Sequence, residues 1–317
     1  MRVLLALGGN AMTGPDGSAT PDAQITAVTD AMAAAARLVA AGHELVVTHG
    51  NGPQVGNLLV KNELAAHVVP PVPLDWCGAQ TQGTLGFTIL DALDVALARL
   101  GAARPVAALV SRVLVDADDP GFTDPTKPVG RYLGREDAQR MVEHGQVWED
   151  RGEKGWRRLV ASPEPRELLD VAAARALLDA GHVVVAAGGG GIPVVRDDDG
   201  TLRGVEAVVD KDLTAALLAR ELGADVLVIA TDVDHVSTGY GTDDERALGR
   251  VDVAGLRALA DAGEFGSGSM GPKVEAVLRF VAGGGRRGVV TSLRHITDAV
   301  DGGVGTVVER DPDPAAP

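Results

Sequence analysis

The sequence is poor in cysteine and in positive charge. Cys77 is the only cysteine among 317 residues, which excludes a disulfide framework and a cysteine-rich metal site and fits a reducing cytoplasm. The formal net charge of −15 disfavours nucleic acids and anionic membranes as partners, because both require a broad basic surface. An anionic ligand must therefore be bound by a few local cations.

Long apolar runs are also missing. Val3–Leu7 is apolar, but it is too short for the core of a signal peptide and ends at Gly8-Gly9. No run approaches the roughly 20 apolar residues of a membrane span. With 45% hydrophobic and 23% charged residues, the composition is that of a soluble globular protein, long enough for one large domain or two.

Two common nucleotide-binding motifs are absent. No Gly-x-x-x-x-Gly-Lys-Ser/Thr sequence occurs, so a Walker A loop is excluded. Gly50–Gly56 contains three glycines, but their spacing is wrong for the dinucleotide-binding fingerprint. A nucleotide would therefore have to bind by another route.

Strand patterns alternate with helical patterns along most of the chain. The apolar runs predict strands at Arg2–Leu7, Glu44–Thr48, Pro105–Val115, Val183–Ala187, Val226–Ala230, Val289–Thr291 and Thr306–Val308. The helical periodicity predicts helices at Asp22–Ala41, Gln54–Ala66, Thr81–Leu100, Arg166–Ala180, Leu213–Leu222 and Val253–Ala262. This alternation predicts an α/β fold, a three-layer αβα sandwich around a mainly parallel open sheet.

One segment interrupts the alternation. From residue 116 to about 165, prolines and glycines crowd together with charges and most of the aromatics, so we interpret this part as a small inserted lobe. We predict an N-terminal lobe over residues 1–187 that contains the insertion, and a C-terminal lobe over residues 188–317. Lys127 lies between Pro125 and Pro128 and is either a surface lysine or a cation carried over the site by a mobile lid.

Glycine-rich turns follow three of the predicted strands. Gly8-Gly9-Asn10 and Gly50-Asn51-Gly52 stand at the carboxyl ends of the first two, where open α/β sheets bind their ligands. Glycines there allow a small anion to approach backbone N–H groups, although each turn alone is also an ordinary left-handed turn. Gly188–Gly191 indicates close approach of a ligand or of a neighbouring element.

Two lysines stand at predicted helix starts. In Asp210-Lys211-Asp212 a cation would occupy the first helical turn, where the macrodipole favours negative charge; this makes sense if a phosphate binds there. The alternative is a solvated turn with Asp210 as N-cap. Pro272 suits the first position of a second helix, which puts Lys273 just inside it. In a chain with 24 Arg and only five Lys, lysine suggests that a compact point charge is needed.

Together these motifs resemble the carbamate kinases of the amino acid kinase superfamily. The matching segments span nearly the whole chain: Leu7–Ala11, Thr48–Gly56, Lys127–Gly130, Gly155–Arg158, Gly188–Val194, Asp210–Asp212 and Gly268–Val274. The segments around Lys127 and Ser269–Lys273 are specific to that branch, whereas the Gly-Gly-Asn and Thr-Asp-Val pieces occur more widely. Trp76 departs from the pattern, because relatives usually carry a smaller residue there.

The resemblance implies reversible phosphoryl transfer between ATP and carbamate, giving ADP and carbamoyl phosphate, often toward ATP during arginine breakdown. Carbamate is already an anion, so its oxygen can attack without a general base, and the protein need only align reactants and neutralise charge. By similarity, Lys211 and Lys273 would stabilise the transferring phosphoryl group and Asp212 would orient them. Lys127 would approach from the lobe.

The resemblance also implies two binding regions. The carbamoyl phosphate end would be held by Gly8, Gly9, Asn10, Gly50, Asn51 and Gly52. The nucleotide pocket would involve Asp210, Thr231, Asp232, Val236, Gly268, Ser269, Met270, Gly271 and Pro272. We expect Mg²⁺ to enter as the ATP complex, because no cluster in the sequence would cage the ion with protein ligands.

The family further implies a homodimer, and the single cysteine favours the cytoplasm. Two alternatives remain: another superfamily kinase acting on a carboxylate or phosphate acceptor such as N-acetylglutamate, and a nucleotide-binding regulator that has lost catalysis. Formation of ATP from ADP and carbamoyl phosphate would separate the carbamate kinase from both.

Overall fold

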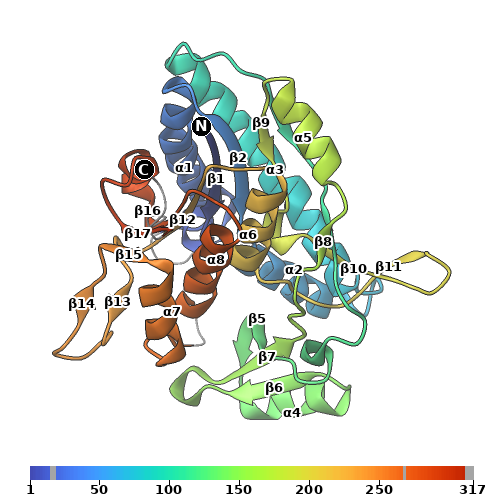
Figure 1. Ribbon diagram of the computed structural model, residues 1–317. Helices are drawn as coiled ribbons and strands as arrows, with labels where there is room; N and C mark the ends of the chain where they lie inside the picture. Colours follow the sequence, from blue (N-terminus) through green and yellow to red (C-terminus); the bar gives the residue numbers. More distant parts are fainter. Residues whose placement is uncertain (15–18, 267–268, 311–317) are drawn as a thin grey trace.

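The structure is a computed structural model that describes residues 1–14, 19–266 and 269–310. Its centre is an eight-stranded sheet in the order β15-β17-β16-β12-β1-β2-β9-β3 (Figure 1). The strands are β1 (Arg2–Leu7), β2 (Glu44–His49), β3 (Val106–Ala108), β9 (Val183–Val185), β12 (Val226–Thr231), β15 (Arg250–Asp252), β16 (Arg287–Ser292) and β17 (Thr306–Glu309). Neighbouring strands are parallel except β16 and β17, so the mainly parallel sheet is confirmed.

Helices cover both faces of this sheet. One face carries α1 (Pro21–Ala40), α3 (Leu74–Arg99) and α9 (Ile296–Val300), and the other carries α5 (Val171–Asp179), α6 (Lys211–Glu221), α7 (Val253–Asp261) and α8 (Met270–Ala282). Strand β1 shows why both faces are covered. Its residues Val3, Leu5 and Leu7 are buried in the core beneath α1, α3 and α9, and Leu4 and Ala6 are buried in the core on the opposite face. A parallel strand buried on both faces has no polar alternation. The three-layer sandwich is therefore confirmed.

The carboxyl ends of the central strands meet at one edge. The N–H of Gly8, after β1, donates to the carbonyl of Ala230 in β12 at 2.9 Å. The N–H of Gly50, after β2, donates to the carbonyl of Leu7 at 3.0 Å. The 3-10 helix η1 (Gly9–Met12) and helix α2 (Gly52–Ala65) begin directly beyond these turns. This edge is where ligands bind in open α/β sheets.

A separate small sheet lies below the main body in Figure 1. It contains β5 (Lys127–Leu133), β6 (Val147–Asp150) and β7 (Trp156–Val160) in the antiparallel order β5-β7-β6, together with α4 (Arg135–Glu143) and the 3-10 helices η2 (Pro120–Phe122) and η3 (Gly152–Lys154). Leu133, Ala138 and Trp148 form its own core. The division of the chain into lobes at residues 187 and 188 stays a prediction.

A further sheet of four strands shows that two sequence predictions are wrong in part. It contains β4 (Arg112–Leu114), β8 (Glu167–Leu168), β10 (Ile192–Arg196) and β11 (Leu202–Gly204). The single strand predicted at Pro105–Val115 is wrong, because the backbone leaves the main sheet after β3, and the N–H of Ser111 donates to the side chain of Gln82 before β4 begins. The helix predicted from Arg166 is wrong at its start, because β8 pairs with β4 first.

The remaining described elements complete the molecule. The long helix predicted from Thr81 begins earlier, at Leu74, whose N–H donates to Oε1 of Glu206 at 3.1 Å. Strands β13 (Ser237–Thr238) and β14 (Arg246–Ala247) form a hairpin that projects from the sheet near α7 in Figure 1. The 3-10 helices η4 (Gly188–Gly190) and η5 (Leu293–His295) are short turns after β9 and β16. None of the described helices is both long and apolar enough to span a membrane.

Candidate active site

Two lysine ammonium groups meet at one buried carboxylate. Lys211 is the first residue of α6, and its Nζ lies 2.5 Å from Oδ1 of Asp212. Lys273 lies in the first turn of α8, and its Nζ is 3.1 Å from Oδ2 of the same carboxylate. Asp212 is only 3% exposed and Lys273 only 8%. Each carboxylate oxygen therefore binds one lysine at the N-terminus of a different helix.

The charge of Asp212 depends on these lysines. Burial alone would raise the pKa of Asp212, but the positive charges of Lys211 and Lys273 and their hydrogen bonds hold that pKa below its ordinary value. The carboxylate is therefore ionised at neutral pH. Two ammonium groups against one carboxylate leave an excess positive charge at two helix N-termini, where the macrodipoles also attract anions. The arrangement suits a phosphoryl group.

Helix α8 differs from its predicted start. The helix begins at Met270, so Pro272 is its third residue rather than its first. Proline is still tolerated there, because the first N–H groups of a helix have no partner within the helix. The Lys273 ammonium also donates to the carbonyl of Ser269 at 3.1 Å, which ties it to the N-cap residue of its own helix.

The small lobe reaches this site through Lys127. Its Nζ lies 2.7 Å from Oδ2 of Asp210, and its side chain is 34% exposed. Asp210 is the N-cap of α6, because its Oδ1 accepts from the N–H groups of Asp212 at 2.9 Å and Leu213 at 3.3 Å. The alternative prediction is therefore right that Asp210 is the N-cap, but wrong that the turn is solvated, since the residue is only 9% exposed.

Two glycine turns bring the ends of β1 and β2 against Lys211. A Cβ atom added at Gly50 would lie 3.2 Å from the backbone N of Gly9 and 3.4 Å from Cδ of Lys211. A Cβ at Gly8 would lie 3.0 Å from the carbonyl oxygen of Ala230. These positions therefore leave room for backbone alone, and Gly9, Gly50 and Lys211 converge.

The other predicted acceptor residues lie in the same turns. The side chain of Asn51 is buried, and its Nδ2 donates to Oγ1 of Thr81 in α3 at 2.8 Å. Asn10 lies within η1, and Gly52 is the first residue of α2. A Cβ at Gly52 would meet no atom within 4 Å, so no close approach requires glycine at that position.

The tetraglycine turn makes room for neighbouring side chains. A Cβ at Gly188 would lie 2.3 Å from Nε2 of His49, and one at Gly189 would lie 2.1 Å from Nδ2 of Asn51. Gly189 also has a φ of +68°, which disfavours any other residue. At these two positions the close approach is that of a neighbouring element, and the turn packs against His49, the last residue of β2, and against Asn51 just beyond it.

His49 is a site neighbour that sequence reasoning missed. Burial lowers the pKa of His49 to about 4, and the charge of Lys211 acts in the same direction, against a hydrogen bond to the Gly50 carbonyl. The neutral ring donates from Nδ1 to that carbonyl at 3.0 Å. Its position directly before Gly50 was the available signal. His49 therefore adds no charge beside the lysines at neutral pH.

A cavity of about 490 Å³ opens beyond the end of β12. It is lined by Asp232, Val233, Asp234, His235, Ser237, Tyr240, Glu245, Ala247, Glu264, Phe265, Gly266, Ser269 and Met270. Three of the predicted nucleotide residues, Asp232, Ser269 and Met270, are among them. The sequence prediction missed the hairpin residue Tyr240, whose 75% exposure is unusual for an aromatic side chain.

The remaining predicted nucleotide residues that the structure describes do not line this cavity. The side chain of Val236 is fully buried in the core, and its backbone N–H donates to Oγ1 of Thr306 at 2.8 Å. Thr231 ends β12, while Gly271 and Pro272 lie in the first turn of α8. Asp210 is at the start of α6, beside the lysines rather than in the cavity. Gly268 lies outside the described residues.

A metal site built by protein ligands is not found in the described part of the chain. No group of three or more His, Cys, Asp or Glu side chains there could hold a metal ion. Cys77 is fully buried in α3, where burial raises the pKa of its thiol. A metal ion used at this site would have to bring other ligands with it.

Known proteins share the sequence and the fold of this chain over nearly its whole length. The model of the amino acid kinase family matches residues 1–292. The carbamate kinase of Thermococcus kodakarensis is 43% identical over 315 residues, covering 98% of this chain and 99% of that protein. The carbamate kinase of Pyrococcus furiosus is 40% identical over 310 residues, covering 97% and 98%. The structure of Giardia lamblia carbamate kinase bound to AMP-PNP is 38% identical, with a TM-score of 0.92 and 98% coverage of both chains.

Proposed function

The chain belongs to the amino acid kinase family, and from that membership we propose that it is a carbamate kinase. It transfers a phosphoryl group reversibly between ATP and carbamate, giving ADP and carbamoyl phosphate. Relatives of that name align over nearly their whole length. A role in arginine breakdown, toward ATP, fits the family. The observation that carries the proposal is the binding of Lys211 and Lys273 to the two oxygens of Asp212.

The two lysines are proposed to stabilise the transferring phosphoryl group. During transfer, negative charge spreads over the three equatorial oxygens of that group, and fixed ammonium groups lower its energy. Asp212 orients both lysines, since each carboxylate oxygen binds one of them. Carbamate carries its own negative charge, so its attack requires no protein base. Lys127 is proposed to add a third cation from the lobe.

The glycine turns are proposed to hold carbamate and carbamoyl phosphate. The residues are Gly8, Gly9, Asn10, Gly50, Asn51 and Gly52. The convergence of Gly9, Gly50 and Lys211 supports this assignment, because a small anion placed beside Lys211 could accept from backbone N–H groups of both turns.

The nucleotide is proposed to occupy the cavity beyond β12. Asp232, Ser269 and Met270 line it, and Tyr240 offers an aromatic face to a base. Asp210, Thr231, Gly271 and Pro272 would then act through the backbone and helix starts around it, whereas Val236 would support the cavity from the core, because its backbone N–H and carbonyl are bound by Thr306 and Leu248. The Giardia lamblia enzyme with AMP-PNP, an ATP analogue, supports a nucleotide site in this fold.

An ATP-dependent kinase implies a divalent metal ion, and we infer that this ion is Mg²⁺. The described residues offer no protein cage for it, which fits an ion that arrives as the nucleotide complex with phosphate oxygens as ligands. When bound, such an ion neutralises charge between the phosphates. The single cysteine and the nucleotide substrate favour the cytoplasm as the compartment.

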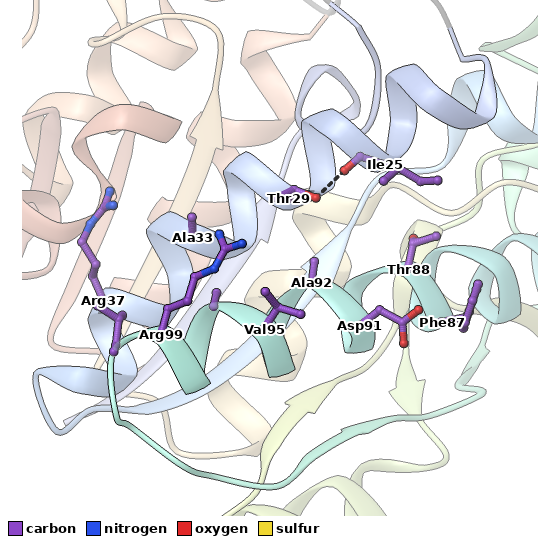
Figure 2. A pocket seen from close by; sticks show the side chains of 12 residues that line it. Ile25, Thr29, Ala33, Arg37, Phe87, Thr88, Asp91, Ala92, Val95 and Arg99 are labelled. Carbon is purple, nitrogen blue, oxygen red and sulfur yellow. Dashed lines mark hydrogen bonds between the residues drawn. The ribbon is translucent and has the colours of Figure 1, made fainter.

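We also propose that the chain forms a homodimer through α1 and α3. A cavity of about 470 Å³ lies between these helices. Among the side chains that line it, Figure 2 shows Ile25 on α1 and Phe87 and Val95 on α3. These three side chains are 52%, 61% and 50% exposed. Antiparallel pairing of α3 with α3 of a second copy, centred near Val95, would place Asp91 of each copy opposite Arg99 of the other.

Sedimentation of the wild type and of a Phe87→Asp, Val95→Asp variant tests the dimer. We expect a two-chain species that the variant converts to monomer, because two charges would enter an apolar contact. An unchanged dimer in the variant would place the interface elsewhere, and a wild-type monomer at micromolar concentration would refute the proposal.

A coupled assay for ATP formation tests the function. Purified protein, ADP and Mg²⁺ are mixed with carbamoyl phosphate, and parallel reactions contain acetyl phosphate or no phosphoryl donor. We expect ATP from carbamoyl phosphate at a rate well above that from acetyl phosphate. Preference for acetyl phosphate, or phosphorylation of N-acetylglutamate by ATP, would favour the rival kinases. Binding of ADP without any turnover would favour the regulator.

A further inference from the structure

The small lobe touches α2 through two glycines. Gly56 lies in α2, and Gly130 lies in the middle of β5. A Cβ atom added at Gly56 would stand 3.3 Å from Cα and 3.6 Å from N of Gly130. Gly130 has a φ of +72°, at the point where the pairing of β5 with β7 shifts its register. Helix and strand therefore meet backbone to backbone, without an intervening side chain.

The same strand carries the lysine that reaches the active site. Lys127 is the first residue of β5, three positions before Gly130, and binds Asp210 at 2.7 Å. Arg131 follows Gly130 and binds Glu63 of α2 at 3.2 Å. The contact between Gly56 and Gly130 thus lies between two ion pairs that join β5 to the main body.

Apolar packing adds to the contact. Val129, beside Gly130, shares a buried cluster with Val55 and Leu59 of α2. Residues flanking both glycines are therefore packed, so a displaced strand could not relax freely into open space. Gly130 lies in the irregularity of β5, but the three residues before it, Lys127 to Val129, are paired in sequence with β7. A displacement at Gly130 would therefore reach Lys127 through two covalently linked residues, Val129 and Pro128, that move as part of one paired segment.

Glycine has no helical advantage at position 56. Within a helix, glycine is less favourable than alanine by about 1 kcal/mol. A side chain at this position would strengthen α2 but press on Gly130. The geometry points to close approach of the lobe as the reason for glycine.

We propose that Gly56 is a positioning residue that sets the place of Lys127 over the active site. The inference rests on the proposed function, in which Lys127 acts on the phosphoryl group. A methyl group at position 56 would move the strand by a few tenths of an ångström. Since about 1 Å of misplacement can cost roughly 100-fold in rate, we expect kcat to fall roughly 3–10-fold.

The first test compares Gly56→Ala and Gly56→Leu with Gly83→Ala. Gly83 is an exposed glycine in α3, and a Cβ there would meet no atom within 4 Å. We expect a graded fall of kcat at position 56, larger for leucine, with unchanged ADP affinity by calorimetry and no loss of Tm for the alanine variant. Near wild-type kcat in both position-56 variants would overturn the proposal. Equal losses in Gly83→Ala would do the same.

The second test asks whether Gly56 acts through Lys127. In a Lys127→Ala background, Gly56→Ala should cause little further loss of kcat, because the residue that it positions is gone. Losses that multiply in the double variant would overturn the proposal.

Crystal structures separate this inference from the proposed function. We expect a longer separation between Lys127 Nζ and Asp210 Oδ2 in Gly56→Ala than in the wild type. An unchanged separation would overturn the positioning role even if the wild type forms ATP. A wild type that forms no ATP would refute the function, while the measured separation would still decide the role of Gly56.

Discussion

Lys127 and Asp210 form an ion pair of 2.7 Å although they stand 83 positions apart in the chain. Asp210 uses its two oxygens differently: Oδ1 caps α6, and Oδ2 accepts from the lysine of the small lobe. Lys211 and Asp212 follow directly in the first turn of that helix. The position of the lobe and the start of the helix that carries the site are therefore linked through one side chain.

Substitutions of Asp210 should separate these two tasks. Asparagine keeps an oxygen for the N-cap but loses the charge that binds Lys127, whereas alanine loses both. We expect Asp210→Ala to lower the free energy of unfolding by about 0.5–2 kcal/mol relative to Asp210→Asn. Urea denaturation measures this difference, and ATP formation should fall in both variants. Equal stabilities would show that the cap contributes little.

Asp252→Ala is the control for loss of a cap alone. Asp252 caps α7 by accepting from the N–H of Gly255 at 2.6 Å. We expect this variant to lose stability similarly while retaining turnover. A comparable fall in ATP formation would mean that the losses at Asp210 report general destabilisation.

Lys127→Ala should spare nucleotide binding and impair turnover. The lysine comes from the lobe and lies beside Asp210, not in the cavity assigned to the nucleotide. We expect the ADP dissociation constant from calorimetry to stay near the wild-type value while kcat falls by roughly 10²-fold or more. Lys154→Ala, at an exposed site in the same lobe, is the control. Unchanged turnover in Lys127→Ala would refute the role of the lysine as a cation over the site.

His49 should make the protein less stable in acid. Its pKa is about 4 in the folded protein against 6.5 ordinarily, so the unfolded chain binds a proton over a pH range where the folded chain does not. The contribution of neutral His49 is complete above pH 6.5 and is lost as the pH falls toward 4, by roughly 2–4 kcal/mol. Urea denaturation at a series of pH values from 7 to 4.5 gives the free energy of unfolding at each pH. We expect this free energy to fall less steeply with decreasing pH in His49→Gln than in the wild type.

His67→Gln controls for loss of a histidine, because His67 is exposed. We expect its stability to follow the wild-type dependence on pH. If His49→Gln shows the full wild-type dependence, another group causes the acid sensitivity.

The sequence was sufficient for the layers of the fold, because central strands buried on both faces are continuously apolar and the helices between them have a clear period. The sequence was insufficient where contacts with side chains distant in the sequence determine where a strand or helix begins and ends. One apolar run, Pro105–Val115, became two strands because Ser111 binds Gln82 of α3. Similarly, Asp170 accepts from the backbone N–H of Arg112 at 2.7 Å, and α5 begins only after it.

The candidate site shows the same limit. Lysines at helix starts and glycines at strand ends are local signals, and the structure brings Lys211, Lys273, Gly9 and Gly50 together at one sheet edge. The ion pair of Lys127 with Asp210 depends on how the lobe packs, which no local pattern encodes. Tyr240 was missed because its hairpin is polar and short, with no periodicity that marks a binding surface.

The joint action of the two lysines is tested by ATP formation from carbamoyl phosphate and ADP in the wild type, Lys211→Ala, Lys273→Ala and the exposed control Lys61→Ala. We expect folded proteins throughout, turnover in the wild type and in Lys61→Ala, and kcat lowered roughly 10²–10³-fold in each of the other two. Near wild-type turnover in either Lys211→Ala or Lys273→Ala would contradict the proposal that both ammonium groups stabilise the transferring phosphoryl group.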